Sequence, residues 1–197
     1  MKRLFDITAA FVGLVVLGPL YFLVVILILV TMGRPVLFRQ ARIGRNERPF
    51  AIIKFRSMVR DADRQGPEFT TGGDARVTPL GRFLRRTKLD ELPQLVNILK
   101  GEMSFVGPRP EVPRYVKLYD ADQRRVLAVR PGLTDPASLA YHNEEEILAG
   151  YTDAEKAYVE KIMPAKLELN LAYLDKAGLL SDLGLIFKTI GRIFCPR

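Results

Sequence analysis

Residues 81–95 read G-R-F-L-R-R-T-K-L-D-E-L-P-Q-L and place two adjacent carboxylates, Asp90 and Glu91, inside a strongly cationic stretch. Proline is tolerated in the first turn of a helix, where backbone N–H groups have no internal partner, so Pro93 indicates a helix start. Leucine and valine then recur at helical spacing until Gly101, which is a typical stop. The acidic pair is therefore predicted at a helix N-terminus, where the macrodipole stabilises carboxylates and phosphates alike. The simpler alternative is that the pair only caps this helix.

The composition points to anionic partners. The chain has 197 residues and a formal net charge of +8, which favours nucleic acid, phospholipid headgroups or phosphorylated metabolites as ligands. Its single histidine, His142, and single cysteine, Cys195, cannot build a zinc site. A bound metal is therefore expected to be a hard cation such as Mg²⁺, held by carboxylate and phosphate oxygens.

An uncharged apolar run occupies residues 7–33. As a straight helix it would reach roughly 40 Å, enough to cross a bilayer, but Gly18 and Pro19 interrupt it near the middle. Basic residues flank both ends, and this bias favours keeping both ends on the cytoplasmic side. The run is too long for a secretory signal and lacks a cleavage site. We predict that residues 1–33 form a re-entrant membrane helix broken at Pro19, and a kinked spanning helix remains the alternative.

The remaining residues, 34–197, are predicted to form a small cytoplasmic catalytic domain. The whole chain is predicted to have an α+β fold that is mainly helical. Dense β-branched and aromatic residues predict a hairpin over residues 36–58 with a turn at 44–47, and the polar stretch 61–78 a long loop. Helices are expected over residues 115–129 and 151–177, with a P-G-L-T turn at 131–134 between them. An amphipathic helix over about 179–194 is either docked on the core or lies in the membrane interface.

Several blocks of sequence together carry a resemblance. They are K-R-L-F-D-I, F-R-Q-A-R-I-G-R-N, F-A-I-I-K-F-R-S-M, L-D-E-L-P-Q-L-V-N-I-L-K-G-E-M-S-F-V-G-P-R-P and V-R-P-G-L-T, and they run almost end to end. In this combination the chain resembles the bacterial sugar transferase family, the monotopic phosphoglycosyl transferases that begin assembly of O-antigen, capsule, exopolysaccharide and glycoprotein glycans. The family's membrane segment is a re-entrant helix broken at a proline, which matches Pro19.

The resemblance implies a reaction and its participants. A sugar-1-phosphate would move from a UDP-sugar to polyprenol (undecaprenyl) phosphate at the cytoplasmic face of the bacterial inner membrane, with release of UMP. It implies that Asp90 is the nucleophile and forms a covalent phosphosugar intermediate, and that Glu91, beside Asp90, holds Mg²⁺. Membrane phospholipids are expected partners, nucleic acid is not, and self-association into a homodimer is left open.

Four cations are candidates for binding the substrate phosphates. Arg85 and Arg109 match motif positions, and arginine presents a planar fork that binds phosphate through two hydrogen bonds. Lys54 and Arg56 lie two apart and share one face of a strand, where they could contact phosphate or headgroups. Each of the four has a plain structural alternative as a solvated charge or a loop tie. Asp6 is expected to pair with a basic residue.

Two other kinds of protein remain as rivals. A membrane-tethered basic binding module would explain the charge but not the acidic pair, and the chain lacks a recognisable nucleic-acid fold. A catalytically inert partner of glycan assembly would not need intact D-E-L-P-Q and G-P-R-P blocks. After P-G-L-T the chain reads D-P-A-S-L where many relatives read G-x-A-Q. The identity of the sugar therefore cannot be carried over from those relatives.

Overall fold

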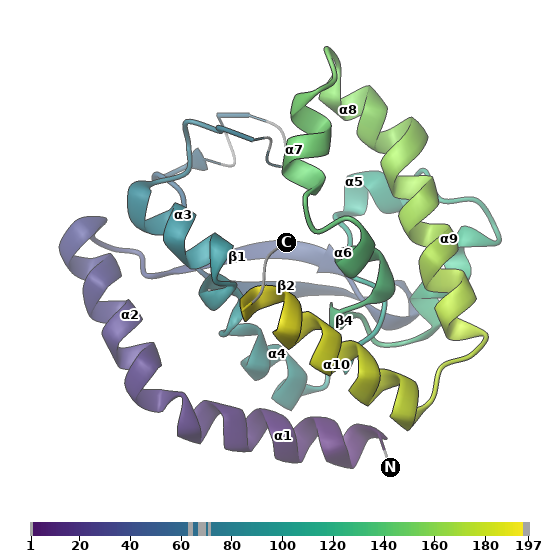
Figure 1. Ribbon diagram of the computed structural model, residues 1–197, viewed down its shortest axis with the longest axis horizontal. Helices are drawn as coiled ribbons and strands as arrows, with labels where there is room; N and C mark the ends of the chain where they lie inside the picture. The colour runs from purple at the N-terminus through teal and green to yellow at the C-terminus, as the bar shows by residue number, and fades with distance from the viewer. Residues whose placement is uncertain (1, 63–64, 67–69, 71, 195–197) are drawn as a thin grey trace.

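A computed structural model describes residues 2–62, 65–66, 70 and 72–194, so Cys195 lies outside the described residues. The fold is α+β and mainly helical, as predicted, with two small two-stranded sheets (Figure 1). The strands are β1 (Leu37–Ile43), β2 (Pro49–Phe55), β3 (Ser104–Val106) and β4 (Gly132–Thr134). The α-helices are α1 (Lys2–Val16), α2 (Gly18–Thr31), α3 (Pro79–Arg86), α4 (Gln94–Lys100), α5 (Pro113–Val116), α6 (Pro136–Ala140), α7 (Glu144–Ala149), α8 (Ala154–Ala157), α9 (Met163–Leu174) and α10 (Leu179–Phe194).

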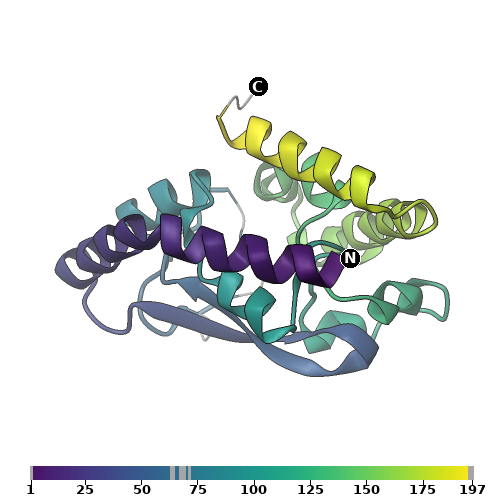
Figure 2. The ribbon, with the colours of Figure 1, turned by 90° about the horizontal axis from the view of Figure 1, so that it is seen from below.

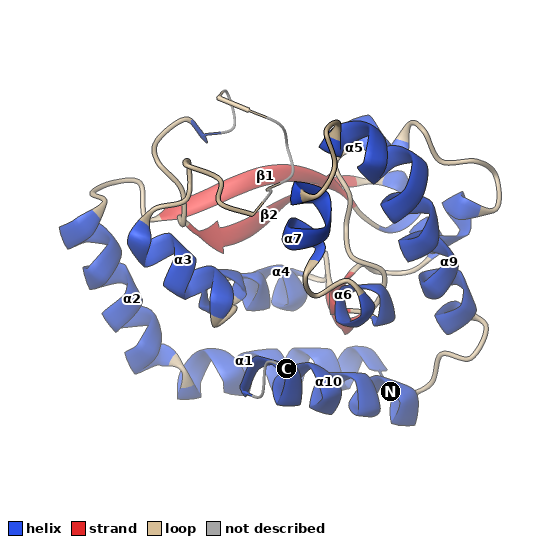
Figure 3. Ribbon diagram, turned by 45° about the horizontal axis from the view of Figure 1, so that its top comes forward, coloured by secondary structure: helices blue, strands red, loops and turns tan. Residues whose placement is uncertain are grey.

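Helices α1 and α2 form a bent pair along one edge of the molecule (Figures 1 and 3). The bend is 61° and falls at Leu17, with Gly18 and Pro19 in the first turn of α2, so the predicted helix break is confirmed. Proline fits there because the first turn has no internal acceptor for its missing N–H. Within the described part of the chain, α1 and α2 reach the length and apolar character of a membrane span only as this bent pair, and no helix reaches them alone.

The predicted hairpin is confirmed as β1 and β2, which pair antiparallel with Leu37 opposite Phe55 and Ile43 opposite Pro49. The turn is the short helix η1 (Arg45–Glu47), in which Asn46 has a positive φ of 55°. Asparagine tolerates this left-handed conformation better than most residues. Strand β2 lies under two apolar clusters, one with α1 and α4 and one with α2 and α3. The hairpin is thus the floor on which the membrane-type helices and the acidic-pair segment rest (Figure 2).

The acidic-pair segment begins after Thr78, which caps α3, and passes through the 3₁₀ turn η3 (Leu89–Glu91) into α4. Pro93 immediately precedes α4, and Gly101 ends it with a φ of 86°, a left-handed conformation that suits glycine. The predicted helix start and stop are confirmed, and the acidic pair lies in the turn just before the helix. The loop predicted over 61–78 has no regular strand or α-helix in its described residues before Thr78; residues 63–64, 67–69 and 71 lie outside them.

The P-G-L-T turn prediction was wrong, because Gly132–Thr134 forms β4 and pairs in parallel with β3. A Cβ on Gly132 would come within 2.2 Å of the Gly107 nitrogen, so the glycine serves the close approach of two backbones. A glycine in the sequence can mark a turn, but it can equally mark a strand that another backbone segment approaches closely. The pairing brings the P-G-L-T block beside the G-P-R-P block.

The prediction of one helix over residues 115–129 was also wrong in part. This region is divided into α5 and the 3₁₀ helix η4 (Gln123–Ala128). Between them the Asp120 side chain accepts a hydrogen bond from the Gln123 backbone N–H at 2.8 Å. An aspartate that bonds nearby backbone in this way competes with helix continuation. The expected helix over residues 151–177 is confirmed as α8, the π-helical turn η5 (Tyr158–Ile162) and α9, which continue into one another.

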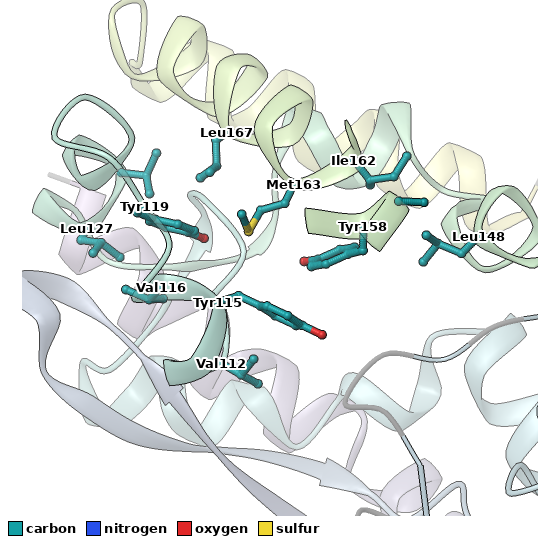
Figure 4. Packing of buried hydrophobic residues seen from close by; sticks show 12 residues of the cluster. Val112, Tyr115, Val116, Tyr119, Leu127, Leu148, Tyr158, Ile162, Met163 and Leu167 are labelled. Carbon is teal, nitrogen blue, oxygen red and sulfur yellow. The ribbon is translucent and has the colours of Figure 1, made fainter. Parts of the chain in front are cut away.

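These helices enclose the largest apolar cluster, in which the Tyr115 and Tyr158 rings lie 5.1 Å apart and which also contains Met163 and Leu167 (Figure 4). Helix α10 then returns across β3, β4 and α6. Its Asp182 is buried and binds Lys2 at 2.7 Å, whereas Leu180 and Phe187 remain 86% and 70% exposed. Helix α10 is therefore docked on one side and apolar on its outer side. The division into a membrane segment, 1–33, and a catalytic domain, 34–197, stays a prediction.

Candidate active site

Glu91 lies between two cations. Its carboxylate accepts two hydrogen bonds from Arg109, at 2.5 and 3.2 Å, and one from Lys54 at 3.2 Å. Strand β2 supplies Lys54, and the G-P-R-P block after β3 supplies Arg109, so the long-range pairing of β3 with β4 fixes this contact. Both carboxylate oxygens of Glu91 are thereby engaged, and the residue is buried.

Asp90 differs from its neighbour. It is only 5% exposed, and its Oδ1 is buried without a hydrogen-bond partner among the described residues. Leaving a buried polar atom unpaired costs about 1–3 kcal/mol, and more for a charged group. Such a group in a native fold calls for an explanation, and a role in catalysis is one of the standard ones.

The pKa values of the two carboxyl groups are shifted in opposite directions. Burial raises the pKa of Asp90 above its ordinary value, although the nearby charge of Lys54 opposes this. Burial also raises the pKa of Glu91, but the charges of Arg109 and Lys54 outweigh it and hold the pKa of Glu91 well below its usual range. Neighbouring carboxyl groups whose environments separate their pKa values are a feature of sites that carry out acid–base or nucleophilic chemistry.

Arg85 stands at the edge of this pair. Its guanidinium donates to Ser57 Oγ at 3.0 Å, Thr70 Oγ1 at 2.9 Å and Glu145 Oε1 at 3.1 Å. The contacts come from β2's end, the 61–78 loop and α7, three segments distant in sequence. Arg85 is partly exposed, and its charge favours ionisation of Asp90.

Arg56 lies elsewhere. It donates to the backbone carbonyls of Met32 and Gly33 at the C-terminal end of α2. The expected pairing of Asp6 with a basic residue is wrong: Asp6 accepts hydrogen bonds from Ser104 Oγ at 3.0 Å and the Phe105 backbone N–H at 3.2 Å. A buried hydroxyl and a backbone amide serve as well as a cation to satisfy a buried carboxylate.

Helix α2 reaches the site directly, because the Tyr21 hydroxyl donates to the backbone carbonyl of Leu92. Tyr21 also packs edge-on against Phe55 of β2, with ring centroids 5.4 Å apart. The acidic pair therefore lies one residue from a contact with the apolar helix pair.

The expected magnesium ion can be tested against these donors. The described residues contain no cluster of three or more His, Cys, Asp or Glu side chains placed to hold a metal. Mg²⁺ is usually held by one or two carboxylates and completes its shell with substrate phosphates and water. The unpartnered Oδ1 of Asp90 is a free hard donor, and Glu91 Oε2, which accepts one hydrogen bond from Arg109, keeps a second lone pair. The pair therefore fits Mg²⁺ once a phosphate is present.

Two residues near the pair were not identified from the sequence. Glu145 belongs to the E-E-E run, whose repetition gives no signal of which glutamate faces Arg85. Gln94 is fully buried, and both polar atoms of its amide have no hydrogen-bond partner in the described part of the chain. Its position in D-E-L-P-Q was available from the sequence, but its burial was not.

Comparison with known proteins identifies the family of the chain. The model of the family described as bacterial sugar transferase matches residues 1–196. The chain belongs to the bacterial sugar transferase family. This membership favours an enzyme over the basic binding module.

Three relatives illustrate the range of the family. The chain is 36% identical over 197 residues to the UDP-N-acetylgalactosamine-undecaprenyl-phosphate N-acetylgalactosaminephosphotransferase of Aeromonas hydrophila, covering 98% of this chain and 43% of that protein. It is 35% identical to the exopolysaccharide production protein ExoY of Sinorhizobium fredii, covering 100% of this chain and 86% of that one. It is 38% identical to the undecaprenyl-phosphate glucose phosphotransferase of Komagataeibacter xylinus, covering 100% and 36%. The chain thus spans less than half of two of these relatives and most of the third.

Proposed function

We propose that this protein transfers a sugar-1-phosphate from a UDP-sugar to undecaprenyl phosphate through a covalent intermediate on Asp90. The observation that carries the proposal is the asymmetry of the acidic pair. One carboxylate is held by two cations, while its buried neighbour keeps an oxygen without a partner. The names of two of the relatives supply the acceptor, undecaprenyl phosphate, and one of them supplies a UDP-sugar donor.

The reaction proceeds in two displacements. In the first, an Asp90 oxygen attacks the phosphorus bonded to the sugar, and the bond from that phosphorus to the bridging oxygen breaks, so that UMP leaves. In the second, a phosphate oxygen of the polyprenol attacks the same phosphorus, and the bond to Asp90 breaks. The carboxylate is regenerated, and the product is a polyprenol diphosphate sugar. Splitting the transfer lets a soluble donor and a lipid acceptor use one site in turn.

The cations have distinct roles in this scheme. Arg109 and Lys54 hold Glu91 ionised and in place, and the partly exposed guanidinium of Arg85 is available to the donor diphosphate. Charge on the phosphates would otherwise repel an anionic nucleophile, so preorganised cations stabilise the transition state. Glu91 and Asp90 would hold Mg²⁺, which when bound neutralises the charge that develops on the leaving phosphate. Arg56 stays a weaker candidate because its contacts are with α2.

The bent helix pair is proposed to enter and leave the membrane on the cytoplasmic side. At its start, Arg3 donates to the backbone carbonyls of Ile98 and Leu99 at 2.6 and 2.9 Å. At its end, Arg56 donates to Met32 and Gly33. Both ends are thus tied to the same polar body, whereas a spanning helix would separate its ends by a hydrocarbon layer about 30 Å thick.

Exposed apolar side chains extend the surface that this arrangement would bury. They lie on the bent pair and on α10, which is joined to α1 through Lys2 and Asp182 and lies along the same side as α1 in Figure 3. They are Leu4, Phe11, Val15, Val16, Phe22 and Val30 of the bent pair and Leu180 and Phe187 of α10. An apolar patch on this scale is typical of a surface that meets a membrane or a partner. The acidic pair would then act at the lipid–water boundary, where the headgroup of a lipid acceptor lies.

The test of the reaction is product formation by the purified protein with a panel of UDP-sugars, undecaprenyl phosphate and Mg²⁺. Wild-type protein should release UMP and form lipid-linked sugar with at least one donor, and Asp90→Asn should do neither. Asp122→Asn, which neutralises an exposed carboxylate, is the matched control and should retain activity. Lipid-linked product formed by Asp90→Asn at the wild-type rate contradicts the proposal.

The test of the topology is labelling of single cysteines in a Cys195→Ser background. One cysteine precedes Met1, and another replaces the exposed Arg34. An impermeant thiol reagent should reach neither position in intact cells and both in inverted membranes. Labelling of the N-terminal cysteine from the periplasmic side excludes the re-entrant arrangement.

A further inference from the structure

Gln94 is an unusual residue for the interior of a small domain. Its exposure is 0%, and neither its Oε1 nor its Nε2 has a hydrogen-bond partner among the described residues. Burying an amide without compensation costs roughly 1–3 kcal/mol in proteins. A leucine or methionine at this position would fill the space without that cost, so the fold alone gives no reason for an amide here.

The unpartnered carboxylate oxygen of Asp90 lies close along the chain. Residues 89–100 run as one helical path: Leu92 and Pro93 have right-handed helical φ and ψ, and the Leu92 N–H donates to the Leu89 carbonyl at 3.2 Å. The Leu95 and Val96 N–H groups likewise donate three residues back, to Leu92 and Pro93, so the path is tight and rises about 2 Å per residue. Asp90 and Gln94 therefore occupy successive turns of the same segment.

Both parts of this segment, η3 with Asp90 and α4 with Gln94, pack against β2. Asn97, three residues after Gln94, donates to the Ala51 carbonyl at 2.8 Å and accepts from the Ile53 N–H at 3.1 Å. The next strand residue, Lys54, pairs with Glu91 at 3.2 Å, and its charge also acts on Asp90. Along the chain, Gln94 thus lies between Asn97, whose amide has its hydrogen bonds satisfied, and Asp90, whose carboxylate does not.

We propose that Gln94 is a positioning residue for the nucleophile: its amide N–H donates to Asp90 Oδ1 in the substrate complex and directs the other carboxylate oxygen at phosphorus. This inference rests on the proposed role of Asp90. The two groups are not hydrogen-bonded to each other in this structure, and catalytic hydrogen bonds often close only when substrate binds. Glutamine has three side-chain torsions with which to make this adjustment.

The experiment compares Gln94→Met with Asn97→Met, two buried amides of the same helix replaced by the same apolar residue. For Gln94→Met we expect a melting temperature equal to or above that of wild type, because an unpartnered amide is removed. Its kcat should fall about 10²-fold, the usual cost of a misplaced reacting group, with the KM for the UDP-sugar within about twofold. For Asn97→Met we expect the reverse: a lower melting temperature, with kcat per folded molecule within about threefold of wild type.

Gln94→Glu provides a second variant of the same length, which when ionised cannot donate to Asp90. Its kcat should be at least as low as that of Gln94→Met. A kcat of Gln94→Met within twofold of wild type overturns the inference. So does a KM raised tenfold at unchanged kcat, which would place Gln94 in ground-state substrate binding, and so does a loss of activity that only follows a loss of stability.

Failure of this inference is distinguishable from failure of the proposed function. If Asp90→Asn is inactive and Gln94→Met turns over normally, only the role of Gln94 is lost. If Asp90→Asn is fully active, the proposed function is lost whatever Gln94 does.

Discussion

Two groups of buried polar side chains lie within the same small protein and differ in how fully their hydrogen bonds are satisfied. The anchor group, Asp6 and Asn97, has partners: Asp6 binds Ser104 and Phe105, and Asn97 binds β2. The second group, Asp90 and Gln94, has unpartnered atoms among the described residues, although both side chains are about as deeply buried as those of the anchor group. The anchors join the N-terminal helix and the hairpin to the core. In the second group, a bound ligand would complete the hydrogen bonding. The difference therefore distinguishes residues that hold the fold together from residues that are available for chemistry.

The largest effect is expected for Asp90→Asn. Turnover should fall at least about 10³-fold, because removal of a nucleophile leaves only the contribution of binding and electrostatics. The melting temperature should stay the same or rise, because a desolvated carboxylate with a raised pKa is replaced by a neutral isostere. UMP release and a thermal melt in the same detergent measure both. A clear fall in melting temperature would mean that Asp90 belongs with the anchors.

A large effect of the opposite kind is expected for Asp6→Ala. Loss of the carboxylate leaves Ser104 and the Phe105 N–H without their acceptor, at a cost of about 3 kcal/mol in the free energy of unfolding. Turnover per folded molecule should change little. Asp6→Asn keeps an acceptor oxygen and should lose less than half as much, as measured by denaturant unfolding. Equal losses in the two variants would show that the hydrogen bonds are not what stabilises the contact.

Glu91→Gln sharpens the contrast within the acidic pair. Breaking a buried ion pair costs about 3–5 kcal/mol, and because Arg109 and Lys54 are partly exposed we expect about 2 kcal/mol. The variant should thus be less stable than wild type, whereas Asp90→Asn is not. Most turnover should be lost, and excess Mg²⁺ should restore little of it. Turnover at the wild-type rate would remove Glu91 from the magnesium site.

The smallest effect is expected for Glu145→Gln. The ion pair of Glu145 with Arg85 is half exposed, and pairs of this kind contribute about 0–1 kcal/mol. We expect the unfolding free energy to stay within about 0.5 kcal/mol of wild type. A loss above about 2 kcal/mol would mean that the Arg85 contacts are part of the anchor group rather than an accessible phosphate fork.

The local features of the fold could be predicted from the sequence. The break at Gly18 and Pro19, the hairpin with its turn at 44–47, and the helix between Pro93 and Gly101 each depend on residues with a fixed backbone preference. The position of Asp90 and Glu91 before that helix followed from the same signals. The sequence thereby located the candidate site, although not its contacts.

The long-range features could not be predicted. Strands β3 and β4 are three residues each and pair across 28 positions, and no local pattern shows that Gly132 meets the Gly107 backbone. The same is true of Glu145 beside Arg85 and of Arg56 at the end of α2, because these partners are distant in sequence. The prediction for Asp6 was wrong because a basic partner was expected, whereas a hydroxyl and a backbone amide supply the hydrogen bonds.

The most direct measurement is the intact mass of the protein after incubation with UDP-sugars and Mg²⁺, without the lipid acceptor, followed by peptide mapping. The account predicts a mass increase of one sugar phosphate with at least one donor, located on the peptide that contains Asp90 and lost when undecaprenyl phosphate is added. Formation of lipid-linked product with no adduct on Asp90, or an adduct that persists in Asp90→Asn, would contradict it.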